Sequence, residues 1–117
     1  MLKIKRAYED KEAGDGKRIL IDRLWPRGVR KDEAGIDEWL KELAPSTELR
    51  RWFGHVPAKW EEFKRRYKKE LAAPEKIQLM ENIAHTAKRA DITLIYSARD
   101  RDHSDVKVLE ELITGRM

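Results

Sequence analysis

Apolar side chains follow the patterns of β-strands in three stretches of the chain. Residues 2–7 alternate apolar and basic side chains, which is typical of a strand with one face in the core. Residues 19–21 and 92–96 are apolar or β-branched with little polar alternation, which favours central strands that are covered on both faces. The second strand should end near Leu24, because Pro26 removes a backbone donor and disfavours helical geometry in the residue before it.

Helical spacing dominates the rest of the chain. Apolar residues recur three and four positions apart in five segments, and each segment is expected to bury one face. Ser46 is suited to cap the second of them, and Pro57 and Pro74 can occupy the first positions of the third and fourth. Ser104 or Asp105 would cap the last. The expected helices cover residues 36–43, 46–53, 57–71, 74–89 and 104–114.

The connections between these segments predict the topology. The segment from Tyr8 to Lys17 is polar and contains the turn signal Gly14-Asp15-Gly16. Its length favours a hairpin over a short crossover, and the direction of the first strand stays open at this point. The helices that follow supply the long connection that parallel strands need, so the second and third strands should be parallel. The pattern predicts an α/β fold with a small, mostly parallel sheet of about three strands and helices packed around it in two or three layers.

Composition narrows the class of protein. The 117 residues suit one domain, covering 1–117, that buries a core without covalent staples. The absence of cysteine excludes disulfides and thiolate chemistry and fits a reducing compartment. No apolar run approaches the ~20 residues of a membrane span, so we expect a cytoplasmic protein with no membrane partner. Charged residues make up 41% of the chain with a net charge of only +4, which chiefly favours solubility.

Polar and aromatic side chains gather where the two buried strands end. Residues 22–28 follow the second strand, and residues 97–101 follow the third. The carboxyl ends of parallel strands lie at one edge of a sheet, so both loops should meet there, near the start of the last helix. Arginine and helix N-termini favour phosphate or carboxylate, which predicts a small anionic partner, a phosphate- or nucleotide-bearing molecule. The residues expected to bind it are Arg23, Trp25, Arg27, Gly28, Ser97 and Arg99, with Arg101 near them.

An internal structural role for the same residues carries equal weight. Asp22 and Arg23 can pair across the strand ends, and Trp25 can plug the core, because polar networks at strand ends are often structural. The aromatic residues of the helical stripes are expected to pack in the core.

The residues for catalysis are less defined. Asp22, His55 and Asp100 are the candidates for moving a proton, but the sequence leaves open whether the protein is an enzyme. Ser97 stands at a strand end without the glycine-flanked elbow of a serine nucleophile, so we expect it to hydrogen bond. The histidines lack ligand spacing, and no metal or other cofactor is expected.

A nucleic-acid-binding surface is an alternative of a different class. Lys64 to Lys69 contains five cations around one tyrosine, which is a pattern that can follow phosphates. Tyr67 falls in the apolar stripe, however, and Glu61, Glu62 and Glu70 dilute the charge. A solvated helix face is favoured over a binding surface.

Four motifs follow one another along the chain, namely Ile21–Val29, Trp39–Arg50, Trp52–His55 and Leu94–Asp100. Together they resemble the YeaO-like proteins, family 488 among the domains of unknown function. The resemblance covers nearly the whole chain and implies a compact α/β fold in a bacterial or archaeal cytoplasmic protein, with no established activity. It also favours a first strand parallel to the second, with residues 8–17 as a compact crossover.

Two departures from the family pattern bear on the site. The last loop of YeaO-like sequences tends to end in Asn-His-Ala, whereas Ser104-Asp105-Val106 stands here, so no role of that histidine carries over. Longer relatives place Cys-Ala-Glu where this chain has Ser97-Ala98-Arg99, which removes thiol chemistry.

Overall fold

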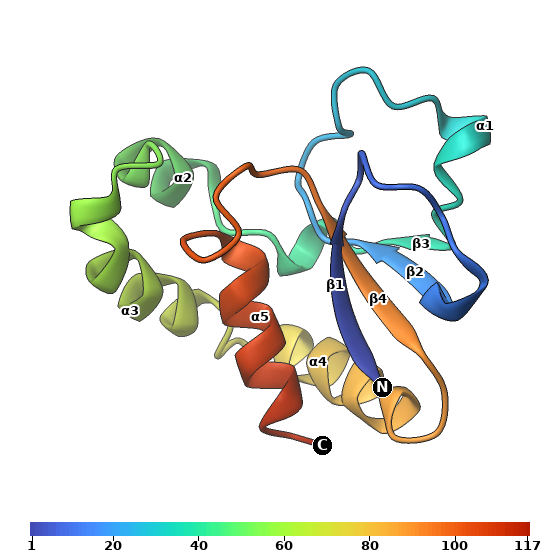
Figure 1. Ribbon diagram of the computed structural model, residues 1–117. Helices are drawn as coiled ribbons and strands as arrows, with labels where there is room; N and C mark the ends of the chain where they lie inside the picture. Colours follow the sequence, from blue (N-terminus) through green and yellow to red (C-terminus); the bar gives the residue numbers. More distant parts are fainter.

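A four-stranded parallel sheet forms the centre of the computed structural model, which describes residues 1–117 (Figure 1). The strands are β1 (Leu2–Arg6), β2 (Lys17–Leu20), β3 (Glu38–Trp39) and β4 (Ile92–Tyr96), and they lie in the order β1-β4-β2-β3. All three pairings are parallel. The expected α/β fold with a small parallel sheet is therefore confirmed, with one short strand more than the three predicted.

Strand β4 occupies the middle of the sheet, and all five of its residues are buried. Leu94 pairs with Ile4 on one side and with Ile19 on the other. These three residues belong to one core cluster of 22 buried residues, whereas Thr93 and Ile95 point to the opposite face. The unbroken apolar run of the sequence is explained by this position, because both faces of β4 are covered.

The four longer helices pack on one face of the sheet. They are α2 (Thr47–Phe53), α3 (Trp60–Glu70), α4 (Pro74–Ala87) and α5 (Asp105–Thr114), and α4 and α5 contact the strands directly. The helical predictions that begin at residues 46, 57, 74 and 104 are confirmed, with a 3-10 turn at Pro57–Lys59 leading into α3. None of the helices combines the length and the apolar composition that crossing a bilayer requires.

Side-chain hydrogen bonds of Ser46 fix the start of α2. The Ser46 hydroxyl accepts a hydrogen bond from the Leu49 amide at 3.1 Å, as the sequence predicts for an N-cap. The same hydroxyl donates to a Glu70 carboxylate oxygen at 2.6 Å, which ties the start of α2 to the end of α3. Gly54 ends α2 in the left-handed conformation, with φ of 54°.

The helix predicted at residues 36–43 is wrong. The segment forms β3 and a 3-10 turn at Lys41–Leu43, and the preceding loop contains the short helix α1 (Lys31–Ala34). The Asp37 amide donates to the Arg18 carbonyl and the Leu40 amide to the Leu20 carbonyl, both at 2.9 Å. Backbone groups that a helix would bond internally are therefore used to extend the sheet, and tertiary pairing overrides the periodicity.

The connection after β1 also differs from the expectation based on its length. The chain does not form a hairpin; it crosses over, so that β1 and β2 lie parallel on the two sides of β4, in agreement with the resemblance. Gly16 makes the tight entry into β2 possible, because its φ is 63° and a Cβ there would lie 2.0 Å from the Asp91 carbonyl oxygen.

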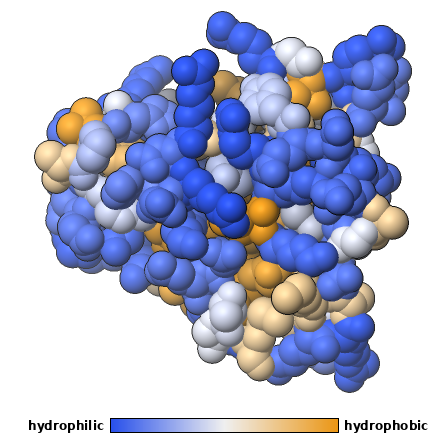
Figure 2. All heavy atoms as spheres, in the orientation of Figure 1, coloured by the Kyte–Doolittle hydropathy of each residue, from blue (hydrophilic) through white to orange (hydrophobic).

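The connections after β1 and β2 cover the opposite face of the sheet, and the second of them contains the short helix α1. Arg18 is only 2% exposed there, and its guanidinium donates to the Asp15 carboxylate at 2.5 Å and to the carbonyls of Ala34 and Gly35. The molecule therefore has two layers. The side turned to the viewer in Figure 2 is mostly hydrophilic, with hydrophobic residues in small, separate groups.

Candidate functional site

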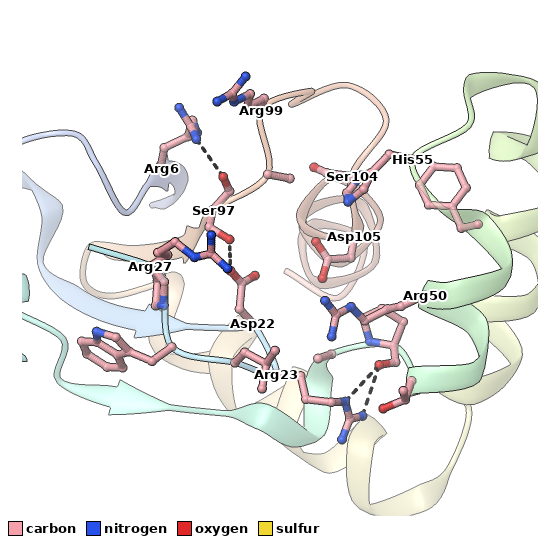
Figure 3. A pocket seen from close by; sticks show the side chains of 18 of the residues that line it. Arg6, Asp22, Arg23, Arg27, Arg50, His55, Ser97, Arg99, Ser104 and Asp105 are labelled. Carbon is pink, nitrogen blue, oxygen red and sulfur yellow. Dashed lines mark hydrogen bonds between the residues drawn. The ribbon is translucent and has the colours of Figure 1, made fainter. Parts of the chain in front are cut away.

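The loops after β2 and β4 meet at the carboxyl edge of the sheet. Leu20 pairs with Ile95 in the register of β2 and β4, so the loops that follow these two strands leave the sheet side by side. Just beyond, the Ser97 hydroxyl donates to an Asp22 carboxylate oxygen at 2.6 Å (Figure 3). This arrangement is the one that two parallel neighbouring strands require, and it places the polar residues of both loops around one hollow.

A cavity of about 910 Å³ opens between these loops, α2 and the start of α5. Seven of the residues that the sequence singled out line this cavity. Six of them follow the ends of β2 and β4, and the seventh follows the end of α2. These residues are Asp22, Arg23, Trp25, Arg27, His55, Ser97 and Arg99.

Three residues expected near the site do not line the cavity. Gly28 forms a turn with φ of 80° beside it. Asp100 accepts a hydrogen bond from the His103 amide and contacts the His103 ring nitrogen Nδ1 at 2.9 Å, an interaction that lowers the pKa of Asp100. The Asp100 side chain is thus engaged in contacts within its own loop. Arg101, the third of the three, lies in the same loop, outside the lining.

Six arginines line the cavity, and none of them forms an ion pair. All arginine salt bridges of the molecule involve other positions, namely Arg18, Arg30, Arg65 and Arg66. Like charges held around one concave surface raise the local positive potential, and no carboxylate lies within ion-pair distance of these six guanidinium groups. The six are Arg6, Arg23, Arg27, Arg50, Arg51 and Arg99.

Two of these arginines are held by carbonyl groups. Arg23 donates from Nε and Nη2 to the Pro45 carbonyl at 3.3 and 3.2 Å. Arg6 donates from Nη2 to the Ser97 carbonyl at 2.8 Å, and its guanidinium lies 4.9 Å from the centre of the Tyr8 ring. The Nε atom of Arg6 is buried without a hydrogen-bond partner.

The sequence did not single out Arg6, Arg50 or Arg51. Arg6 ends β1, whose position beside β4 could not be read from its alternating pattern. Arg50 and Arg51 stand on the polar side of α2, where a charged residue is ordinarily read as solvated. Only the packing of α2 over the carboxyl edge places them at the cavity.

Two aspartates lie in the middle of the cavity wall (Figure 3). Burial raises the pKa of Asp22, while hydrogen bonds from Ser97 partly oppose that rise. Burial, and then the negative charge of Asp22, raises the pKa of Asp105 to about 7, although the Val106 amide donates to its Oδ1 at 2.9 Å. Asp105, which the sequence suggested only as a helix cap, therefore shares a proton-sensitive site with Asp22.

The remaining lining residues complete the walls. Trp25 donates its indole N–H to the Val29 carbonyl at 2.6 Å and meets Trp39 edge to face at 5.5 Å. His55 has a positive φ of 57°, and its ring lies 5.9 Å from that of Phe53. No group of three metal-ligating side chains is found in the molecule. The arrangement can hold an anion and, at the aspartates, hydrogen-bond donors.

These features define a small parallel α/β protein with an arginine-lined pocket at the carboxyl edge of its sheet. A family model described as "Inactive DUF488-N3 subclade" matches residues 1–117, and the chain belongs to this family. The chain is 42% identical over 110 residues to the uncharacterized protein YeaO of Escherichia coli strain K12, which covers 94% of each chain. The expected YeaO-like membership is thus confirmed.

A second relative comes from Mycobacterium tuberculosis. Its uncharacterized protein Rv3073c is 36% identical over 115 residues, which cover 98% of this chain and 95% of that protein. No solved structure matches the chain.

Proposed function

We propose that this protein binds a small anionic metabolite, one that bears phosphate, in the arginine-lined cavity. The observation that carries the proposal is that six arginines surround a cavity of about 910 Å³ without one internal ion pair. The family description includes the word "Inactive", which supports binding without turnover. A cytoplasmic location is part of the proposal, because a chain without cysteine fits a reducing compartment.

Phosphate suits these guanidinium groups for a physical reason. Planar guanidinium groups donate two parallel hydrogen bonds to a phosphate or carboxylate, and such charge-assisted bonds are stronger than neutral ones. Arg27, Arg50, Arg51 and Arg99 donate no side-chain hydrogen bond within the protein, so their donors remain free for a ligand. The volume also lies in the range of pockets for small ligands, roughly 300–1,000 Å³.

The alternative of a nucleic-acid surface at residues 64–69 receives less support. Arg65 and Arg66 both pair with Glu62, whose pKa falls to about 2 because of their hydrogen bonds. Lys64 pairs with Glu61 at 3.3 Å. Carboxylates of the same helix thus balance much of the positive charge, and the observations favour the cavity.

A thermal-shift screen tests the proposal. Inorganic pyrophosphate and a panel of phosphorylated metabolites are added to the protein, and at least one should raise the melting temperature, since a ligand stabilises the folded state by RT ln(1 + [L]/Kd). Arg27→Ala and Arg50→Ala should remove most of that increase. Arg89→Ala is the matched control, because Arg89 is exposed just beyond α4, before the amino end of β4. If no anion stabilises the native chain more than the two pocket variants, the proposal is wrong.

An oligonucleotide titration tests the alternative in the same preparation. Charge reversal at Arg65, Lys68 and Lys69 should weaken binding and reduce its salt dependence if the helix face contacts phosphates. Unchanged binding in that variant rejects the helix face.

A further inference from the structure

We infer that the ligand of this cavity is a phosphate ester of a polyhydroxylated molecule, a sugar phosphate, whose phosphate contacts the arginines while its hydroxyl groups contact Asp22 and Asp105. The inference rests on the proposed function and deepens it. It begins from the two aspartates, which a site for a simple anion does not need and would be expected to exclude.

The first step is the state of the two carboxyl groups. Neither Asp22 nor Asp105 forms an ion pair, although six arginines line the same cavity. Asp22 accepts hydrogen bonds from Ser97, and Asp105 accepts backbone bonds at the start of α5. A carboxylate has about four acceptor positions, so both groups keep capacity for donors from a ligand.

The second step is the kind of donor. An ammonium group would be repelled by the surrounding guanidinium groups, and a second anion would be repelled by the aspartates. A hydroxyl group carries no charge, donates to a carboxylate and accepts from a protonated carboxyl group or an arginine. Neutral hydroxyl groups are therefore the ligand groups that neither the arginines nor the aspartates repel.

The third step is the arrangement of the charges. Figure 3 shows Asp22 and Asp105 between Arg27 on one side and Arg50 on the other, with Arg6 and Arg99 farther along the wall. The two acidic side chains thus lie together, with cationic side chains on both sides of them. A ligand that satisfies both must carry its anionic and its neutral donor groups on one small framework.

The fourth step is size and the remaining wall. A lone phosphate would fill a small part of about 910 Å³ and would offer no hydrogen-bond donor to the remaining acceptor positions of the two aspartates. Leu24, Trp25 and Phe53 add apolar surface for the carbon skeleton of a larger molecule.

Calorimetric titration of the native chain with three probes tests the inference. Ribose 5-phosphate has both kinds of group, ethyl phosphate has only the phosphate, and ribose has only the hydroxyl groups. We expect ribose 5-phosphate to bind at least tenfold more tightly than either of the others. Asp22→Asn and Asp105→Asn should each reduce that tenfold advantage while ethyl phosphate binds equally well or more tightly. Asp10→Asn is the control, since Asp10 is exposed in the connection after β1.

The outcomes separate this inference from the proposed function. If ethyl phosphate equals ribose 5-phosphate and the aspartate variants change nothing, the inference is overturned while anion binding stands. If neither ester binds, the inference is likewise overturned, and the pyrophosphate and metabolite screen with its arginine variants decides separately on the proposed function. Circular dichroism confirms that each variant is folded, and two aspartate positions keep the test valid if one of them fails to fold.

Discussion

His55 has a backbone conformation that favours glycine. Its φ of 57° lies in the left-handed region, directly after Gly54, which is also left-handed. Histidine tolerates this region better than branched residues do, but a Cβ still adds strain. The imidazole lines the cavity, so a strained residue stands where the ligand is proposed to bind.

Replacing His55 with glycine should therefore separate stability from binding. We expect His55→Gly to raise the melting temperature by a few degrees, because the strain is relieved, and to weaken pyrophosphate binding. His85→Gly is the matched control, since His85 is exposed within α4 and glycine there should lower the melting temperature. Equal losses of stability in the two variants would contradict the role of strain at position 55.

Asp105 makes the folded state sensitive to pH. Its pKa is raised from 3.8 to about 7, so the folded chain holds a proton that the unfolded chain has released. The unfolded state binds fewer protons between about pH 4 and 7, and the contribution of this group to stability falls as the pH rises through that window.

Asp105→Asn should remove this dependence. We expect the variant to be more stable than the native chain by roughly 2 kcal/mol at pH 8 and to differ little near pH 4, because only the charged form is penalised by burial. Urea unfolding at both pH values measures the difference. A variant whose gain in stability is the same at both pH values, or that loses stability at pH 8, would show that Asp105 is not destabilising when charged.

Among the elements, β3 departs most from its sequence pattern. Ile36, Trp39, Leu40 and Leu43 recur at helical spacing, yet the segment pairs with β2. The Trp39 indole donates to the Asp22 carbonyl at 2.6 Å, so this short strand also supports the first residue of the site loop. Hydrophobic periodicity indicates which residues are buried. It does not indicate whether a neighbouring strand is in place to form backbone hydrogen bonds with the segment.

The side chain of Asp37 reinforces that pairing and offers a test. Its Oδ2 accepts the Arg18 amide at 2.8 Å. We expect Asp37→Ala to cost about 1 kcal/mol of stability, since the amide loses its acceptor, and to speed hydrogen exchange at the Leu40 amide. Asp32→Ala is the control, because Asp32 is exposed and pairs only with Arg30. Unaltered exchange at Leu40 would argue against this anchoring.

For the whole molecule, strand order creates the site. The order β1-β4-β2-β3 brings the ends of three parallel strands to one edge, so that Arg6, the loop after β2 and the loop after β4 converge. Helices α2 and α5 then close the hollow with Arg50 and Asp105. The positive charge of the cavity is therefore a property of topology, since the net charge of the chain is only +4.

The sequence by itself determined the buried strands β2 and β4, the four longer helices and, through the rule for parallel strands, the meeting of the two arginine-bearing loops. Those features depend on local patterns of burial and on connection length, which are written along the chain. Only the tertiary structure decided that residues 38–39 join the sheet, that β1 lies beside β4, and that Arg6, Arg50 and Asp105 face the cavity. Each of these depends on a partner distant in sequence, and a partner's position is set by packing of the whole chain.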